Sequence, residues 1–446
     1  MLLSFSVKNF RSFAQEAELF MSKRSFKTNH PKYGDWAAVV NPAAGIFGAN
    51  ASGKTTLIYA LDELVKLPAY SMVNDSLVKG LYNPHKLSEE EDVEFLLDFV
   101  HGAMRYRWQL VIGPAGVVYE SVWVSERRQF KMIFERDEAG IDFGPSSDIA
   151  AVARGFIEQG ATDWVSVTSP WIKAKSSGKF AGAFKWLSRQ IHLLTPASLH
   201  RGLLSPFVNT LLEEEKWREL ASPMLRFADV GVDSVSVEEH EVPKAKRALF
   251  ENVLKVMNEV SSGEKTDSPQ IPDKETVLTF AHVAEGGRTF ELEHGEESTG
   301  TRVWMDTALP ALHTIFSGGV LLVDEIDSSL HPLLVRQLVG MFTDPEINRN
   351  GAQLIFTSHD MTLLGNFPDP ALDMEAAWLC EKNDSYSSLK SIDEFKLPKT
   401  ANAEKRYMQG AFGAVPLVPH SELVMKFASL VGEFNDESVS LSAKGR

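Results

Sequence analysis

Residues 48–55 read Gly-Ala-Asn-Ala-Ser-Gly-Lys-Thr and fit the phosphate-loop pattern G-x-x-x-x-G-K-[ST] without a mismatch. The apolar residues 44–47 in front of this stretch are typical of a strand, and residues 56–61 behind it are typical of a helix. Glycines let a backbone curl closely around phosphate oxygens, and the free amides at the start of the following helix attract anions. The stretch therefore predicts an ATP site with these nucleotide contacts: Gly48, Asn50, Ser52, Gly53, Lys54, Thr55 and Thr56.

The last positions of this loop have distinct predicted roles. Lys54 is expected to reach the β- and γ-phosphates. The Thr55 hydroxyl is expected to complete the ligand shell of a Mg²⁺ ion, which makes ATP and Mg²⁺ the predicted cofactors.

An acidic pair, Asp324 and Glu325, follows the short apolar run at residues 320–323. In P-loop proteins a carboxylate at the end of such a strand binds Mg²⁺ through water, which is the role predicted for Asp324. Glu325 is predicted to polarise the attacking water as a general base. The acidic pair follows Lys54 by 270 residues (324 − 54 = 270), so a large segment is inserted between the two halves of the core.

Two further segments surround the acidic pair. Residues 327–332 read Asp-Ser-Ser-Leu-His-Pro, and residues 357–360 read Thr-Ser-His-Asp. Together with the two motifs above, this combination resembles the ABC-type ATPases of the SMC, RecF and OLD group. The resemblance implies that Asp327 lies in a loop that communicates across an ATP-bound dimer, and that His359 contacts the γ-phosphate. For His331 a structural role in the loop is at least as well supported as a catalytic one.

A degenerate signature motif stands at residues 297–302, which read Glu-Ser-Thr-Gly-Thr-Arg. The resemblance implies that Ser298 and Gly300 grip the γ-phosphate held by the opposite subunit, although the motif departs from Leu-Ser-Gly-Gly-Gln. Such half-sites need a homodimer or a higher homo-oligomer to be complete. The sequence does not locate the glutamine of the Q-loop.

The opening residues 5–13 resemble the first strands of SMC and RecF proteins, and residues 404–416 resemble the ending of a narrower family. That family comprises prokaryotic stand-alone ATPases related to OLD, including AriA-like and RloB-associated ATPases of bacterial defence loci. It implies a sensor or regulatory ATPase of an anti-phage, abortive-infection-like system that controls a separate effector such as a nuclease. Only 87 residues follow His359 (446 − 359 = 87), so we expect no Toprim nuclease domain within the chain.

Two other functions remain open from the sequence. A RecF-like DNA-repair ATPase would clamp DNA when ATP drives dimerisation, and an ATP-gated scaffold would bind ATP without hydrolysing it. The net charge of −15 argues against nonspecific coating of DNA, yet two basic clusters keep DNA possible as a partner. The clusters are Lys23, Arg24 and Lys27, and Lys244, Lys246 and Arg247. The Glu325 base argues against the scaffold.

The expected fold is α/β: an ABC-type P-loop ATPase core with an antiparallel β-lobe and a mainly helical insertion. We divide the chain into residues 1–140 (first half of the core with the lobe), 141–275 (insertion) and 276–446 (second half of the core). The single cysteine, Cys380, is expected in the core, and the chain shows neither a signal peptide nor a membrane span. These features predict a cytoplasmic protein that does not contact the membrane.

Local patterns add detail to these three parts. An antiparallel meander is predicted at residues 93–100, 105–112, 117–124 and 130–134, and a hairpin at 277–283 and 289–292. Helices are predicted at 55–67, ending before Pro68, and at 245–260, 302–316 and 333–342; residues 150–220 favour helix throughout, and 261–274 favour a polar loop. The tryptophans at 164, 171 and 186 are read as core residues or as a partner surface, and the carboxylates at 89–92 as a solvated loop.

Overall fold

The structure is a computed structural model. It describes residues 1–127, 129–145, 147, 151–174, 178–199, 206–228, 231–242, 274–284, 286–365, 371–398 and 402–412, with a few further residues between 247 and 252 and between 424 and 428.

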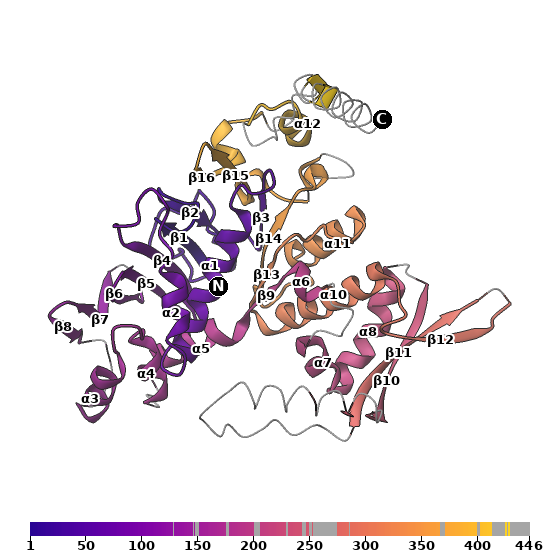
Figure 1. The fold of residues 1–446 in the computed structure, drawn as a ribbon, viewed down its shortest axis with the longest axis horizontal. Helices are drawn as coiled ribbons and strands as arrows, with labels where there is room; N and C mark the ends of the chain where they lie inside the picture. The colour runs from indigo at the N-terminus through magenta and orange to yellow at the C-terminus, as the bar shows by residue number, and fades with distance from the viewer. Residues whose placement is uncertain are drawn as a thin grey trace, which may run out of the picture.

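A six-stranded sheet forms the centre of the molecule, in the order β16-β15-β3-β14-β13-β9 (Figure 1). The strands are β16 (Tyr386–Ser391), β15 (Ala377–Asn383), β3 (Ala43–Phe47), β14 (Gln353–Ser358), β13 (Val320–Val323) and β9 (Ile191–Leu194). Every neighbouring pair is parallel except β15 with β16. All residues of β3, β13 and β14 are buried, as expected for a parallel sheet that is covered on both faces. The α/β core is therefore confirmed.

Helices cover both faces of this core sheet. Helix α1 (Lys54–Tyr70) shares an apolar cluster with Leu322, whereas α10 (Thr299–Ser317) and α11 (Pro332–Thr343) share the other cluster with Leu321. Adjacent residues of a strand point to opposite faces, so α1 lies on one face and the other two helices lie on the opposite face.

The predicted end of the first helix before Pro68 is wrong. Helix α1 continues to Tyr70, with Pro68 inside it and buried. Proline removes one hydrogen bond from the helix, but the next bonds can still form, and the Ser71 amide donates to the Leu67 carbonyl at 3.0 Å. Burial of the last turn against the core holds the helix past its proline.

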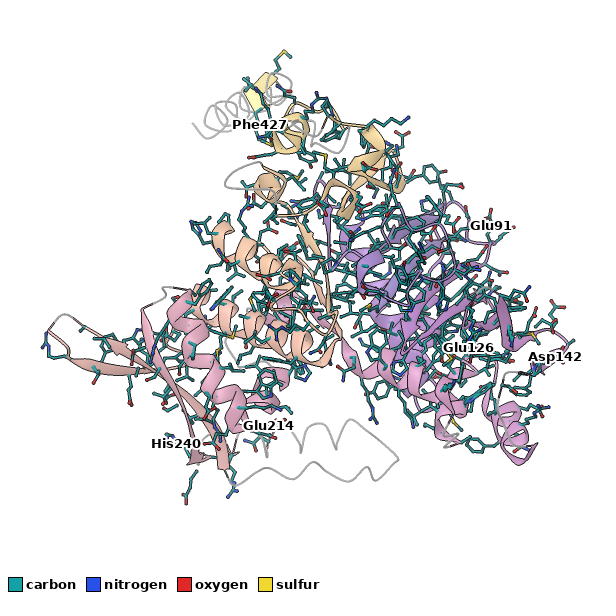
Figure 2. All side chains as sticks on the ribbon, turned by 180° about the vertical axis from the view of Figure 1, so that it is seen from behind. Glu91, Glu126, Asp142, Glu214, His240 and Phe427 are labelled. Atoms are coloured by element: carbon teal, nitrogen blue, oxygen red, sulfur yellow. The ribbon has the colours of Figure 1, made fainter. Side chains whose placement is uncertain are left out.

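A seven-stranded antiparallel sheet forms the β-lobe, in the order β2-β1-β4-β5-β6-β7-β8. Its strands are β1 (Leu2–Lys8), β2 (Ala17–Phe20), β4 (Val93–His101), β5 (Met104–Gly113), β6 (Gly116–Ser125), β7 (Phe130–Asp137) and β8 (Gly140–Phe143). The predicted meander is confirmed, and β8 extends it. The carboxylates Glu89 to Glu91 are exposed at the rim of the lobe, where Figure 2 labels Glu91.

The segment predicted as a helical insertion contains many helices but also strands. Its helices are α3 (Ala151–Gly160), α4 (Thr168–Lys173), α5 (Lys179–Gln190), α6 (Pro196–Leu199), α7 (Pro206–Leu212) and α8 (Glu215–Phe227). Strand β9 lies within this range and forms an edge of the core sheet, which the sequence reading missed. The division into three domains stays a prediction, and β9 ties its middle part to the core.

A small antiparallel sheet packs against α8 and consists of β10 (Val232–Glu241), β11 (Lys274–Val283) and β12 (Thr289–Glu293). The predicted hairpin is confirmed by the pairing of β11 with β12. The predicted helix at 245–260 and polar loop at 261–274 fall almost entirely outside the described residues.

Short helices complete the described structure: α2 (Ser76–Leu81), α12 (Ala403–Met408), η1 (Ala37–Val39), η2 (Met361–Leu364), η3 (Met374–Ala376) and η4 (Ile392–Phe395). Among the described residues, none of the helices has the length and apolar character needed to cross a bilayer.

Candidate nucleotide-binding site

The phosphate loop connects β3 to α1, and its glycines occupy positions that other residues would not tolerate. Gly48 has φ 151°, and a Cβ atom there would lie 2.1 Å from the Cys380 carbonyl oxygen of the neighbouring strand β15. Gly53 has φ 112°, and a Cβ atom there would lie 2.7 Å from Ser387 Oγ and 2.9 Å from Ser12 Oγ. The loop is therefore pressed against the sheet, and only glycine fits at these two positions.

Lys54 points back into its own loop. Its Nζ donates to the carbonyl oxygens of Gly48 at 2.8 Å and Ala49 at 3.0 Å, and lies 3.4 Å from His359 Nδ1. Burial lowers the pKa of Lys54, and nearby groups that include Asp324 partly oppose this shift. A cation with partners of this kind can exchange carbonyl oxygens for phosphate oxygens.

Thr55 and Asp324 form one corner of the site. Thr55 Oγ1 donates to Asp324 Oδ1 at 3.0 Å, and Thr357 Oγ1 donates to the same oxygen at 2.7 Å. Asp324 is only 4% exposed, and the two hydroxyl donors hold its carboxylate in place. A hydroxyl and a carboxylate suit Mg²⁺, which uses one or two protein oxygens and takes its other ligands from phosphates and water. In the described part of the chain, no cluster of three or more His, Cys, Asp or Glu side chains suited to a metal occurs.

Glu325 lies in the turn after β13 with φ 52°, a left-handed conformation that is uncommon outside glycine. Its amide donates to Thr357 Oγ1 at 2.7 Å, so the same threonine holds both members of the acidic pair. The strained backbone aims the Glu325 side chain along the wall of a cavity of about 320 Å³. This cavity is lined by Ser12, Asn50, Ala51, Ser52, Gly53, Lys54, Thr55, Thr56, Glu325 and His359.

His359 and Asp327 are joined through the backbone. The His359 amide lies 3.3 Å from both carboxylate oxygens of Asp327 and donates to them. The histidine that lines the cavity is thus held by the loop in which Asp327 lies. His331 has a local role, because it caps α11 and its Nδ1 accepts from the Leu333 amide at 3.2 Å.

The structure does not bring the signature residues to this cavity. Ser298 is the N-cap of α10, and its Oγ accepts from the Thr301 amide at 3.1 Å. Gly300 lies beside the loop after the acidic pair, since a Cβ atom there would be 3.6 Å from the Ser329 carbonyl oxygen. The roles of Ser298 and Gly300 therefore stay predictions that require a second subunit.

The sequence reading missed two serines that touch the phosphate loop. Ser12 lines the cavity from the connection between β1 and β2, and Ser387 Oγ on β16 donates to the Ser52 carbonyl at 2.6 Å. Ser12 stands in the quoted opening segment, but nothing in its local pattern marks it as a nucleotide contact. Ser387 reaches the loop only because the sheet pairs β16 with β15.

Other predicted features fall outside the site. Cys380 is buried, as expected, and burial raises the pKa of its thiol to about 11. Trp171 is a core residue at 1% exposure. Arg24 of the first basic cluster is ion-paired with Asp393 at 3.2 Å and Glu394 at 3.1 Å, and the second cluster lies outside the described residues apart from Arg247.

The arrangement of phosphate loop, acidic strand end and neighbouring strands is that of an ABC-type P-loop ATPase core. Residues 43–365, well over half of the chain, match the family described as "AAA domain, putative AbiEii toxin, Type IV TA system". The chain belongs to this AAA family. No curated protein sequence matches it.

Solved structures with some likeness to this AAA protein include SMC heads. The SMC head domain from Thermotoga maritima has 13% sequence identity and a TM-score of 0.41, with 87% of this chain and 98% of that chain covered. The Smc head domain from Pyrococcus furiosus, with an extended coiled coil and bound to the C-terminal domain of ScpA, has 12% identity and a TM-score of 0.38, with 89% and 97% covered.

Proposed function

We propose that this AAA protein binds ATP with Mg²⁺ and hydrolyses it. One observation carries the proposal: residues from three separate motifs, Lys54, Glu325 and His359, line a single cavity together with the phosphate loop. Their chemistry complements the groups that develop charge during phosphoryl transfer.

Each side chain has a role in this proposal that follows from its position. Lys54 binds the β- and γ-phosphates in place of the carbonyls it now contacts. Thr55 and Asp324 hold the magnesium ion, which neutralises phosphate charge when bound. Glu325 takes a proton from the attacking water, and His359 contacts the γ-phosphate.

We further propose that the working unit is a homodimer or a higher homo-oligomer. Ser298 and Gly300 lie away from the cavity of their own chain, on the side where the loop of Ser329 approaches α10. A second copy would bring these residues to the γ-phosphate, with Asp327 and His359 linking the two sites.

At the cellular level we propose a sensor or regulatory ATPase of a bacterial anti-phage, abortive-infection-like system. It would act in the cytoplasm and control a separate effector such as a nuclease. Support comes from the family description, which names an AbiEii toxin and a Type IV TA system. The RecF-like DNA clamp is less well supported, because Arg24 is already neutralised by two carboxylates of η4.

The enzymatic proposal is tested by following phosphate release from ATP by wild type, Lys54→Ala and Glu325→Gln, with mass photometry on each sample. Glu346→Gln is the matched control, because it is the same isosteric change at an exposed carboxylate in the turn after α11. We expect turnover to fall by on the order of 10²-fold or more in both site variants, with an ATP-dependent larger species accumulating for Glu325→Gln. Wild-type turnover that equals that of Glu325→Gln would refute the proposal.

The defence proposal needs a cellular assay. Phage plating efficiency is compared between cells that carry the gene with its genomic neighbour and cells with the Lys54→Ala form. Protection that depends on Lys54 supports the regulatory role, whereas equal plating on both strains against a broad phage panel contradicts it.

A further inference from the structure

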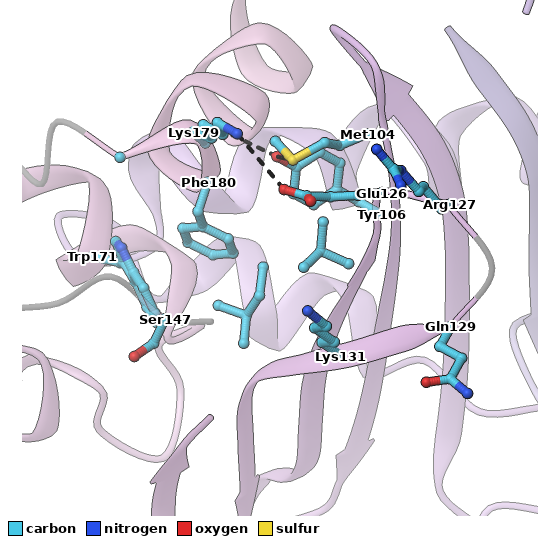
Figure 3. A pocket seen from close by; sticks show the side chains of 13 residues that line it. Met104, Tyr106, Glu126, Arg127, Gln129, Lys131, Ser147, Trp171, Lys179 and Phe180 are labelled. Carbon is cyan, nitrogen blue, oxygen red and sulfur yellow. Dashed lines mark hydrogen bonds and ion pairs between the residues drawn. The ribbon is translucent and has the colours of Figure 1, made fainter. Parts of the chain in front are cut away.

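A second and larger cavity, of about 860 Å³, lies on the β-lobe, away from the ATP site. It opens between strands β5 to β7 and the helices α4 and α5 (Figure 3). Its volume falls in the range of pockets that enclose small molecules, and it exceeds the cavity of about 320 Å³ at the phosphate loop.

The rim of this lobe cavity is cationic. Arg127, Lys131 and Lys179 line it together with a single carboxylate, Glu126. Figure 3 shows Lys179 and Lys131 on different sides of the opening, one on helix α5 and the other on strand β7. In a chain with a net charge of −15, three cations around one pocket favour an anionic ligand.

These cations are available for a ligand. The only ion pair among the lining residues described joins Lys179 to Glu126 at 3.6 Å, and their side chains are 76% and 66% exposed. Exposed pairs of this kind contribute little to stability, so a phosphate can displace the carboxylate at small cost.

The floor of the cavity is aromatic and apolar. Tyr106, Trp171 and Phe180 line it, and the ring centroids of Trp171 and Phe180 are 4.2 Å apart. These rings are at most 5% exposed and belong to the lobe core. Val124 and Ile133 complete an apolar surface on which a planar ring can lie.

We propose that this cavity binds a small phosphorylated molecule that carries a planar ring, of the size of a nucleotide. The phosphate lies at the cationic rim formed by Arg127, Lys131 and Lys179, and the ring packs on the apolar side chains of the lining. An uncharged apolar ligand would leave the cations without a partner, and a bare anion would make no contact with the apolar side chains that line the cavity.

Binding at this cavity has a short route to the ATP site, and this part of the inference rests on the proposed function. Helix α5 begins at the cavity with Lys179 and Phe180 and ends at Gln190, directly before β9. Strand β9 pairs with β13, and the Asp324 amide donates to the Leu194 carbonyl at 2.9 Å. Helices α4 and α5 also pack on α1, the helix of the phosphate loop. A ligand that fixes the start of α5 therefore acts on both motifs of the ATP site.

The site is tested by isothermal titration of the full chain carrying Lys54→Ala, so that binding at the phosphate loop is suppressed. The probes are AMP, GMP, CMP and UMP, with the matching nucleosides and inorganic phosphate as the two halves of the ligand. We expect at least one nucleotide to bind more tightly than its nucleoside and than phosphate. The absence of binding by all four nucleotides at millimolar concentration would overturn the proposal.

Charge-reversal variants locate the binding. Lys131→Glu and Lys179→Glu are each expected to weaken it by about tenfold or more, because each removes a charge-assisted hydrogen bond to phosphate. Lys173→Glu is the control, since Lys173 is exposed on α4 but does not line the cavity. Both altered lysines are exposed, so the variants should fold. Lys131→Gln removes the charge without reversing it and should therefore weaken nucleotide binding less than Lys131→Glu. Equal affinity in all variants would overturn the proposal.

The coupling is tested separately by measuring ATP turnover of wild type with and without the bound nucleotide. We expect at least a twofold change that disappears in Lys131→Glu. Binding without any change in turnover would overturn the coupling and leave the site standing. A wild type that binds the nucleotide but hydrolyses no ATP would instead contradict the proposed function.

Discussion

The core sheet and the β-lobe build their cavities in different ways. In the core, β3 and β13 are wholly buried. The phosphate loop directly follows β3, and the acidic pair directly follows β13. In the lobe, burial alternates along strands such as β5, and the cavity is assembled from side chains of several strands and helices. The core site thus depends on backbone geometry, whereas the lobe depends on which side chains meet across the sheet.

The largest effect on stability is expected in the lobe, at the buried Glu120. Its carboxylate accepts from Trp108 Nε1 at 3.0 Å, Ser166 Oγ at 2.6 Å and the Val167 amide at 2.8 Å. Glu120→Ala leaves Trp108 Nε1 and the Val167 amide without an acceptor, whereas Ser166 Oγ can still donate to Thr168 Oγ1 at 2.5 Å. Each orphaned buried donor costs about 1–3 kcal/mol. We expect a loss of about 4 kcal/mol in the free energy of unfolding, measured by urea denaturation.

Glu120→Gln serves as the control for this variant, because it keeps the volume and one acceptor oxygen. It should lose less stability than Glu120→Ala. If the alanine variant is as stable as wild type, the hydrogen bonds to Glu120 do not stabilise the lobe. The lobe would then not differ from the core in its dependence on side-chain contacts.

The next effect tests the backbone geometry of the core. Gly48→Ala places a Cβ atom 2.1 Å from a backbone oxygen that cannot move without shifting β15. Strain of this kind costs about 2–3 kcal/mol, and it falls on the phosphate loop. We expect ATP affinity, measured by fluorescent nucleotide titration, to fall by at least about tenfold, which corresponds to about 1.4 kcal/mol.

Gly102→Ala is a suitable comparison for Gly48→Ala. Gly102 also has positive φ, at 61°, but a Cβ atom there meets nothing within 4 Å. It should lower stability slightly and leave ATP affinity unchanged. Equal ATP affinities in the two variants would show that the loop adapts, against our reading of the core.

This contrast also explains what the sequence could predict. The phosphate loop and the acidic pair Asp324 and Glu325 are contiguous stretches at strand ends. Their residue types and spacing are therefore enough to predict the ATP site. Strand β9 was missed because its four residues lie inside a long range that favours helix, and only its pairing with β13 defines it. Ser387 was missed because it reaches the loop by strand pairing.

The lobe cavity could not be predicted from the sequence either. Its cations stand at positions 127, 131 and 179, and no local pattern links them. The cavity exists because β7 and α5 meet in space. Residues that meet only through tertiary structure leave no signal in a single sequence.

A third effect concerns His192 on β9, at the border of the core sheet. Burial, and to a smaller extent His313, lower the pKa of His192 from 6.5 to about 4. Because the unfolded chain binds this proton more readily than the folded one, the neutral His192 lowers the free energy of unfolding as the pH falls from 6.5 towards 4. Above pH 6.5 the residue is neutral in both states and causes no loss. At pH 5 this loss amounts to about 2 kcal/mol.

His192→Phe keeps the ring beside Phe207 but cannot be protonated. We therefore expect the unfolding free energy of this variant to change less between pH 7 and pH 5 than that of wild type, by about 2 kcal/mol. His294, whose pKa burial also lowers to about 4, is present in both proteins and cancels in the difference. Parallel pH profiles would mean that β9 tolerates the charge.

The smallest effect on stability, and the sharpest test of the core, is Gly300→Ala. Gly300 lies in the first turn of α10, and a Cβ atom there would make only ordinary contact with the Ser329 carbonyl at 3.6 Å. Alanine favours a helix over glycine by up to about 1 kcal/mol, so the melting temperature should stay equal or rise slightly. If Gly300 approaches the γ-phosphate of a second subunit, the added methyl group nevertheless lowers ATP turnover and the ATP-dependent larger species, while ATP affinity of the single chain is kept. Unchanged turnover in a stabilised variant would mean that the start of α10 does not face nucleotide, and the second half of the composite site would have to be sought elsewhere on the core.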